Sequence, residues 1–265
     1  MKYLKYFEET DAYEAYKNGS DFITPNVSYT VDTKKVYYNP HAAAVISYNM
    51  VDLGLPSGLK WADRNVGALS PEDAGLYFAW GETVGYTVEQ VEAGEKTFDF
   101  SDYFDTTNNG LTFNKYNHEG GLTVLETADD AAAVNMGSNW RMPTNNEYEE
   151  LINNTTATFI DLDGNEFTQD EVWNGSISEG NLKGVKFTGS NSNSIFIPAA
   201  GRYDQQYYDD IRSKNLECYV WSSNINDWDN ENAKYLGVYG DFIAAGDFER
   251  LSSRGIGMSV RGVCN

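Results

Sequence analysis

Short runs of β-branched and aromatic residues recur along this chain, separated by long intervals rich in Gly, Asn and Asp. Such runs are typical of β-strands, and the intervals are typical of surface loops. The clearest helix signal lies at residues 144–152, where Thr144 and Glu147 form the pattern of a capping box before an apolar face. This order of segments predicts an α+β fold with few helices, short strands and long loops.

The main body is predicted to begin near Met50 with two strands joined by a Pro-Ser-Gly turn, the second strand covering residues 60–65. Residues 83–117 are acidic, aromatic and rich in Gly and Asn, which predicts a long surface excursion. The other expected elements are strands at residues 76–82, 185–188 and 194–201 and an Ala-rich helix at residues 127–136 that ends at Gly137.

The last fifth of the chain has two strand-like runs, residues 219–223 and 257–263, around a polar and aromatic interval, residues 224–256. The interval sustains no period of 2 or 3.6, so we expect the core to present it and not to contain it. Rigid aromatic rings among polar side chains are typical of contact surfaces. The candidate ligand-binding residues are Trp228, Asp229, Asn230, Asn232, Tyr235, Tyr239, Asp241, Phe248 and Arg250.

Two segments are rich in side chains with oxygen atoms and are therefore candidate calcium-binding loops. Residues 161–165 begin as a calcium loop does, but Gly164 comes early and Glu171 falls one position short of the expected ligand. A plain hairpin turn is therefore the favoured interpretation. Residues 226–232 are denser in such oxygens, and there we favour a metal-free contact loop, with calcium as the alternative. No cofactor is expected.

The net charge of −21 excludes binding along a nucleic-acid backbone, which requires an excess of Lys and Arg. No apolar segment is long enough for membrane insertion, and the first nine residues lack the apolar run of a secretory signal, so we expect folding in a cytoplasm. Cys218 and Cys264 lie beside the two strand-like runs that frame residues 224–256. Two buried free thiols are favoured, and a disulfide is the alternative.

The sequence gives little support for a catalytic site. The chain has two histidines, His41 and His118, both in loop-like sequence, so a His-based nucleophilic site lacks its parts. Carboxylates are plentiful, but no pair lies in an apolar setting that would separate the two pKa values. We therefore do not expect an enzyme.

Residues 1–48 differ from the rest. Thr10 is placed to cap a short helix over residues 11–17, and residues 26–31 and 36–40 flank a polar turn as in a β-hairpin. A two-turn helix and one hairpin bury too little surface to be stable alone. The segment is therefore expected to dock on something else, which divides the chain into residues 1–48 and 49–265.

Five blocks in the second part resemble the Fibrobacter-succinogenes-type major paralogous domain, which is abundant in Bacteroidales and their phages. The blocks are residues 51–62, 77–82, 140–144, 197–201 and the pair 221–223 with 259–261. The resemblance implies a C-type-lectin-like domain with short antiparallel strands, related to formylglycine-generating enzymes and retroelement-diversified variable proteins. It implies that residues 224–256 face a ligand. Four tryptophans within the blocks are expected in the core: Trp61, Trp80, Trp140 and Trp221.

The paired cysteines of formylglycine-generating relatives are not matched, since Cys218 and Cys264 are far apart in sequence, which argues against carrying that oxidase activity over. The first forty residues are similar to a leader on structural proteins of Bacteroides phages, including crAss-like phages. That similarity implies attachment to a capsid or other virion protein. The attachment residues expected from it are Tyr13, Tyr16, Phe22, Ile23, Tyr29, Tyr37 and Tyr38.

Taken together, these resemblances predict a phage virion structural protein, a capsid decoration or head fibre, located on the particle. Its lectin-like domain is expected to bind glycans or proteins of a host surface or of mucus. A homo-oligomer, with a trimer favoured, is expected because repeated weak contacts gain from multivalency. The alternative is a bacterial cell-surface lectin or adhesin of the same domain family.

Overall fold

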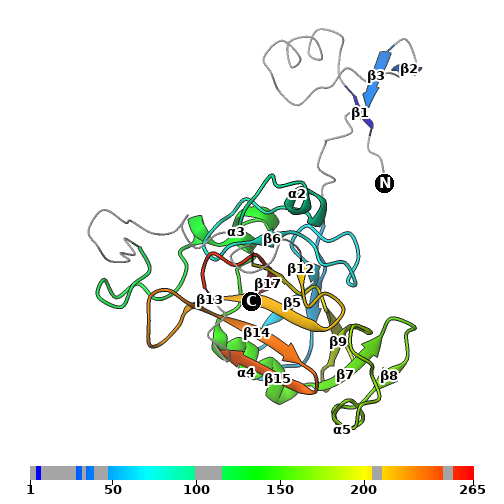
Figure 1. Ribbon diagram of the computed structural model, residues 1–265. Coiled ribbons are helices and arrows are strands. Elements are labelled where there is room, and N and C mark those ends of the chain that lie inside the picture. Colours follow the sequence, from blue (N-terminus) through cyan, green and yellow to red (C-terminus); the bar gives the residue numbers. More distant parts are fainter. Residues whose placement is uncertain are drawn as a thin grey trace. The chain divides into compact units, whose positions relative to one another are not determined.

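The computed structural model describes residues 47–98, 115–204, 211–246 and 253–265, together with the backbone of three short strands near the N-terminus. Two compact units result, Met1–Ser47 and Tyr48–Asn265. The division falls one residue before the boundary expected from the sequence. Figure 1 shows the elements of both units.

The first unit contains a three-stranded antiparallel sheet in the order β1-β3-β2. Strands β2 (Ser28–Val31) and β3 (Lys34–Tyr38) form the predicted hairpin, with Tyr29 opposite Val36. The sequence did not predict β1 (Leu4–Tyr6), which pairs with the other side of β3. The helix expected at residues 11–17 lies outside the described residues.

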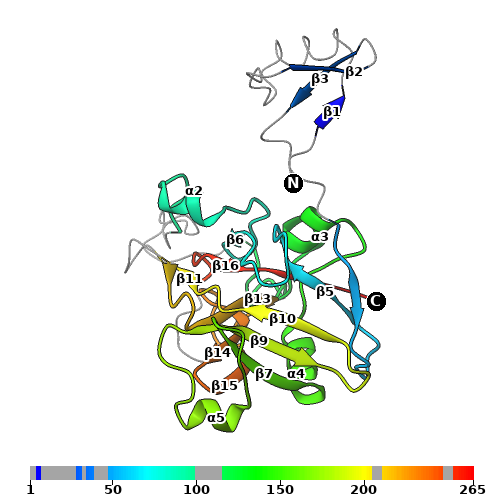
Figure 2. The same ribbon diagram turned by 90° about the vertical axis from the view of Figure 1, so that its right-hand side faces the viewer.

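The second unit is α+β and mostly antiparallel. Its largest sheet has the order β15-β14-β13-β16-β6, a second has the order β10-β9-β7-β8, and a third has the order β17-β5-β4. Strands β10, β9 and β7 run side by side in Figure 2. The bounds of the strands in these sheets are β4 Met50–Asp52, β5 Lys60–Asn65, β6 Tyr77–Phe78, β7 Thr156–Asp161, β8 Glu166–Phe167, β9 Leu182–Thr188, β10 Ser194–Pro198, β13 Glu217–Ile225, β14 Ala233–Tyr239, β15 Phe242–Gly246, β16 Met258–Ser259 and β17 Arg261–Cys264.

Short helices and a two-stranded ribbon complete the second unit. The ribbon pairs β11 (Arg202–Tyr203) with β12 (Ile211–Arg212). The helices are α2 Val88–Glu92, the 3-10 helix η2 Thr127–Asp129, α3 Ala131–Met136, α4 Asn145–Asn154 and α5 Gln169–Trp173. Helix α4 begins as predicted, because Thr144 and Glu147 form a capping box, and α3 ends at Gly137 as predicted.

Strand β13 supports cores on both faces of the largest sheet. Cys218 and Val220 point into a cluster with α4 and the sheet β10-β9-β7-β8, whereas Tyr219 and Trp221 point into a cluster on the other face. Because both faces are covered, β13 is buried along nearly its whole length. All four tryptophans expected in the core are buried: Trp61, Trp80 and Trp221 lie in these two clusters and Trp140 in a smaller one.

A buried arginine joins two sheets, β17-β5-β4 and β10-β9-β7-β8. The guanidinium of Arg261 on β17 donates hydrogen bonds to Asn65 Oδ1 (2.9 Å), to the carbonyl of Ala62 (2.8 Å) and to the carbonyl of Phe196 (2.6 Å). Burial lowers the pKa of Arg261 to about 10, so the group remains charged at neutral pH. Three carbonyl oxygens therefore replace the water that this charge loses.

Residues 224–256 correct one expectation, since they contain a core strand, β14, and the edge strand that pairs with it, β15. Strands β14 and β15 lie here, with Leu236 and Val238 fully buried. Because β14 is covered on both faces, its sequence does not alternate between apolar and polar residues. The excursion expected at residues 83–117 is likewise not all surface, because Val91, Phe98 and Tyr116 are buried.

The framing strands themselves pair as expected, with Val220 parallel to Ser259. Cys218 and Cys264 are both free and buried, in separate hydrophobic clusters. Residues 161–165 form the expected hairpin turn between β7 and β8, where Asp161 accepts hydrogen bonds from Asn165.

Candidate binding site

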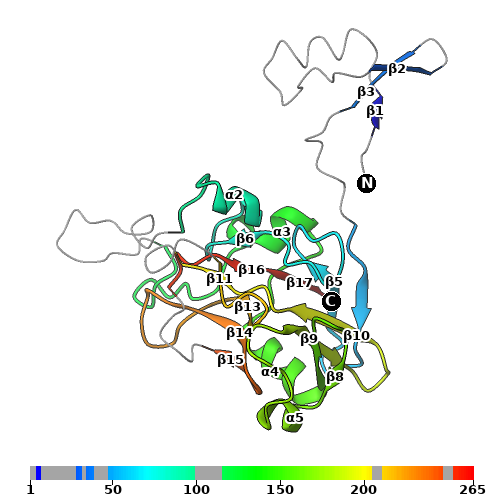
Figure 3. The ribbon, with the colours of Figure 1, turned by 45° about the vertical axis from the view of Figure 1, so that its right-hand side comes forward.

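The most exposed aromatic side chain among the described residues is Trp228, whose side chain is 90% accessible. It lies in the connection between β13 and β14, residues 226–232, which we call the Trp228 loop. In Figures 1 and 3 this connection and strand β4, where the second unit begins, lie on opposite sides of the unit.

The Trp228 loop is held by hydrogen bonds within itself. Asn226 Oδ1 accepts from the backbone N–H of Trp228 (2.8 Å), and Asp229 Oδ1 accepts from the N–H groups of Glu231 (2.9 Å) and Asn232 (2.8 Å). The N–H of Asn226 donates to the carbonyl of Asn232 (2.9 Å) and closes the loop at its base. Asn and Asp favour such turns because their short side chains reach nearby backbone groups.

A segment more than a hundred residues earlier in the chain supports the Trp228 loop from outside. We call residues 117–121 the His118 segment. The N–H of His118 donates to Asn230 Oδ1 (2.9 Å), its ring Nε2 bonds to the carbonyl of Asn226 (2.9 Å), and Asn230 Nδ2 donates to Glu119 Oε2 (2.9 Å). The pKa of Glu119 lies below its ordinary value because its own backbone N–H and Asn230 both bond to the carboxylate.

Beneath the Trp228 loop lies Arg254, which is 4% exposed. Its N–H donates to the carbonyl of Glu231 (3.1 Å), and its guanidinium donates to the carbonyl of Tyr116 and stacks on the ring of Trp80 with a 4.8 Å separation. Burial lowers the pKa of Arg254 to about 10, which still leaves the side chain cationic at neutral pH. Arg254 therefore ties the loop to the segment that carries His118.

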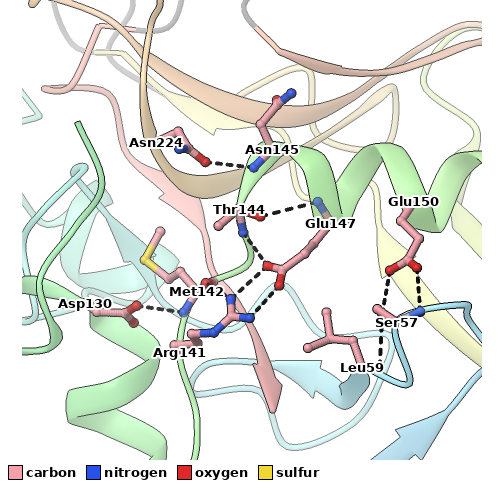
Figure 4. Close-up of polar contacts among 10 residues, drawn as sticks. All are labelled: Ser57, Leu59, Asp130, Arg141, Met142, Thr144, Asn145, Glu147, Glu150 and Asn224. Atoms are coloured by element: carbon pink, nitrogen blue, oxygen red, sulfur yellow. Dashed lines mark hydrogen bonds and ion pairs between the residues drawn. The ribbon is translucent and has the colours of Figure 1, made fainter. Parts of the chain in front are cut away.

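The start of α4 anchors the strand that leads into the Trp228 loop, as Figure 4 shows. Asn224 Oδ1 accepts from the N–H of Asn145 (2.8 Å), and the N–H of Ser223 donates to the carbonyl of Pro143 (2.8 Å). The capping box that begins α4 is itself held by Arg141, which donates to both carboxylate oxygens of Glu147. A locally encoded helix start thus fixes the end of β13 and, through it, the base of the loop.

The surroundings of Trp228 are polar and carry negative charge. The Trp228 loop, the His118 segment and Lys234 together contain four carboxylates and one lysine. Lys234 pairs with Asp227 at 2.7 Å, and both ends of this ion pair stay partly solvated. The indole is therefore a single apolar ring within a hydrogen-bonding, anionic rim.

The structure brings four of the predicted ligand-binding residues together and separates others. Trp228, Asp229, Asn230 and Asn232 share the Trp228 loop. Tyr239 and Asp241 lie at the far end of β14, a seven-residue strand that spans about 20 Å, so one small ligand cannot contact both groups. The carbonyl of Asp241 accepts from Gln169 Nε2 (2.7 Å) and belongs to a different surface.

Tyr235 is the clearest correction to the predicted site. Its side chain is 0% exposed and packs against Tyr219 and Trp221 in the core. Position 235 faces inward because it lies opposite Trp221 in the β13–β14 ladder. It therefore cannot contact a ligand at the surface.

Several predicted residues cannot be placed. Phe248 and Arg250 lie outside the described residues. The same holds for four expected attachment residues in the first unit, Tyr13, Tyr16, Phe22 and Ile23. Tyr29, Tyr37 and Tyr38 lie on β2 and β3, of which the backbone alone is described.

Three residues that build the site were missed from sequence. His118 is exposed as expected, but its bonds to the Trp228 loop were not foreseen, nor was the role of Glu119. Arg254 was not singled out within residues 224–256. No local pattern marks any of them, because their partners are distant in sequence and only the fold brings them close.

Within the described ranges, no group of three or more His, Cys, Asp or Glu side chains is arranged to hold a metal ion. Every helix there is too short or too polar to cross a bilayer. Comparison with family models, curated proteins and solved structures finds no match for the chain.

Proposed function

We propose that this chain is a virion structural protein of a Bacteroides phage, a capsid decoration or head fibre, that displays a C-type-lectin-like adhesion domain. Residues 1–47 attach to a capsid or other virion protein. Residues 48–265 contact a glycan or protein of a host surface or of mucus through the Trp228 loop. The protein acts by binding and not by catalysis.

The exposure of Trp228 is the observation that carries the binding role. A tryptophan buries a large apolar surface when it packs in the core. An indole left in water therefore does not add the folding free energy that a buried indole contributes. The chain places its other described tryptophans largely inside, with Trp173 as the exception. A rigid aromatic ring on a loop that is already ordered also binds at a low entropic cost.

The domain assignment is supported by the architecture of the second unit. Its short antiparallel strands, few helices and long connections are the features that the resemblance implies. Strands β5 and β17, near the start and at the end of this unit, pair with each other. This pairing brings the two ends of residues 48–265 together in one sheet.

The attachment role rests on the resemblance of the first forty residues to phage leaders and on the small size of the unit they form. A three-stranded sheet of short strands buries little apolar surface. Binding to a virion protein would supply the missing contacts. A symmetric oligomer, with a trimer favoured, would raise the avidity of several weak Trp228 contacts.

Purified particles test the attachment role. Mass spectrometry of density-purified virions should detect the full chain. Virions of a phage that encodes only residues 48–265 should lack the truncated protein, because the attachment unit is gone. Absence of the full chain from wild-type particles would refute the proposal. Enrichment of the chain in the envelope of cells without prophage would instead favour a bacterial cell-surface adhesin.

A further inference from the structure

The chemistry around Trp228 identifies a class of ligand, an inference that rests on the proposed binding function. We propose that the Trp228 loop binds an uncharged sugar ring by stacking on the indole, and that it does so without a bound metal ion. Three features of the loop favour this ligand: the size of its apolar spot, the charge of its rim and the bonds that its oxygen atoms already make.

Among the described residues of the Trp228 loop and the His118 segment, the apolar spot has the size of one ring. The neighbours of Trp228 in sequence, Asp227 and Asp229, are charged, and the loop's outside partners, His118 and Glu119, are polar or charged. A stable protein interface needs a contiguous apolar core flanked by a polar rim, over many residues on each side. A pyranose has one apolar C–H face edged by hydroxyl groups, and so it matches an isolated indole edged by hydrogen-bonding side chains.

The rim selects against anionic ligands. Among the described residues of the site, the carboxylates of Asp227, Asp229, Glu231 and Glu119 outnumber the cations of Lys234 and the buried Arg254, and the whole chain carries a net charge of −21. A sulfate, uronate or sialate brought to the indole meets like charges within about a Debye length, so screening by salt is incomplete. Neutral sugars incur no such repulsion, and the carboxylates can accept hydrogen bonds from their hydroxyl groups.

Three side chains of the loop, Asn226, Asp229 and Asn230, already use oxygen atoms to hold the protein's own N–H groups. Asp229 Oδ1 accepts from two backbone N–H groups, and both of its oxygens accept from Asn232 Nδ2 at 3.1 and 3.2 Å. Asn226 Oδ1 holds the N–H of Trp228, and Asn230 Oδ1 holds the N–H of His118. Calcium requires six to eight oxygen ligands, so to recruit these atoms it must break the bonds that shape the loop.

The chain offers a matched control for the indole. Trp173, at the end of α5, is 74% exposed, while the tryptophans Trp61, Trp80, Trp140 and Trp221 are at most 7% exposed. Trp173→Ala therefore removes an exposed indole from another element and leaves the Trp228 loop intact. Trp173→Ala and Trp228→Ala each remove a solvated ring, so neither substitution is expected to unfold the protein.

Affinity electrophoresis of the full chain tests the proposal with named probes. Gels contain mannan, arabinogalactan, dextran or xylan as uncharged polysaccharides and heparin or alginate as anionic ones, each with calcium and with EDTA. We expect the protein to be retarded in at least one gel with an uncharged polysaccharide, and equally so with calcium and with EDTA. We expect no retardation in the anionic gels. Trp228→Ala should weaken retardation about tenfold or more, the usual effect of truncating an aromatic anchor, whereas Trp173→Ala should not.

The outcomes separate the ligand class from the proposed function. Retardation that needs calcium, that survives Trp228→Ala or that is confined to anionic gels overturns the inference. Absence of retardation in every uncharged gel overturns the sugar assignment as well. If Trp228→Ala nevertheless reduces adhesion to host cells, the loop binds a ligand of another class and the proposed function stands. If adhesion is unchanged, the binding role of Trp228 fails.

Discussion

Glu147 provides the most quantitative test of how the site is built, because a single carboxylate holds both a helix start and an arginine. Glu147 Oε2 accepts from the backbone N–H of Thr144 (2.7 Å) and from Arg141 Nη1 (2.7 Å), and Oε1 accepts from Arg141 Nη2 (Figure 4). Replacement by alanine removes all three bonds. The helix start that it weakens is the one that holds Ser223 and Asn224 at the end of β13.

The expected cost of Glu147→Ala follows from these contacts. Loss of the capping interaction costs about 1 kcal/mol. Loss of the two-bond pair with Arg141 costs about 1 to 2 kcal/mol, a value reduced because the arginine side chain is 39% exposed and regains water. The total of about 2 to 3 kcal/mol corresponds to a Tm lower by about 4 to 12 °C for a unit of this size.

Thermal unfolding of the full chain, followed by circular dichroism, measures this change. Glu171→Ala is the matched control, because Glu171 has the same role in the capping box of α5 but is exposed and has no arginine partner among the described residues. We expect the control to lower the Tm by less than half as much. Equal shifts in the two variants would show that the Arg141 pair contributes nothing and would refute the reasoning.

Glu147→Gln adds a dependence on pH. Burial alone would raise the pKa of Glu147, but the bonds from Arg141 and Thr144 outweigh it and hold the pKa below its ordinary value of 4.5. A carboxylate with a lowered folded-state pKa contributes stability that is complete above its unfolded pKa and disappears as the pH falls through the folded value. The Tm gap between wild type and Glu147→Gln should therefore be constant from pH 7 to about pH 5 and shrink below about pH 4.5. A gap that stays undiminished as the pH falls well below 4.5 contradicts this explanation.

Three further predictions concern the fold. Arg261→Lys should destabilise the protein by about 3 kcal/mol in urea unfolding, because an ammonium cannot reach three fixed acceptors; an effect below about 1 kcal/mol would exclude the proposed joint between sheets. Gly189→Ala places a Cβ 1.9 Å from the carbonyl oxygen of Leu53, so its Tm should fall well below that of Gly120→Ala, where the nearest atom is a side-chain oxygen at 2.9 Å. Burial raises the pKa of the Cys218 and Cys264 thiols, so a thiol reagent at neutral pH should label two cysteines in denaturant and none in the native protein; fast native labelling would contradict their burial.

Features with local signals in the sequence could be predicted. The start of α4 at Thr144 depends on a side chain and a backbone group three residues apart, and the structure shows that capping box. The hairpin of β4 and β5 was likewise marked by its turn residues, and the pairing Met50–Ala62 confirms it. In both cases the interacting groups are close in sequence, so the pattern is visible without the fold.

Features that depend on distant contacts could not be predicted. Strand β14 was taken for part of a presented interval because it is covered on both faces and contains Gly237, so no alternation marks it. For the same reason Tyr235 was assigned to a ligand although it lies in the core. The support of the Trp228 loop by His118 joins segments 108 residues apart, as the His118–Asn226 bond shows, and no composition or spacing reveals such a contact.

The central claim, that the Trp228 loop is the contact surface of a displayed adhesion domain, is tested most directly by adhesion of the full chain to Bacteroides host cells. Fluorescent beads coated at equal density with wild type, Trp228→Ala or Trp173→Ala protein are counted on the cells after washing. The account predicts that wild type and Trp173→Ala beads adhere equally and that Trp228→Ala reduces adhesion at least tenfold. Equal adhesion of all three proteins would contradict it.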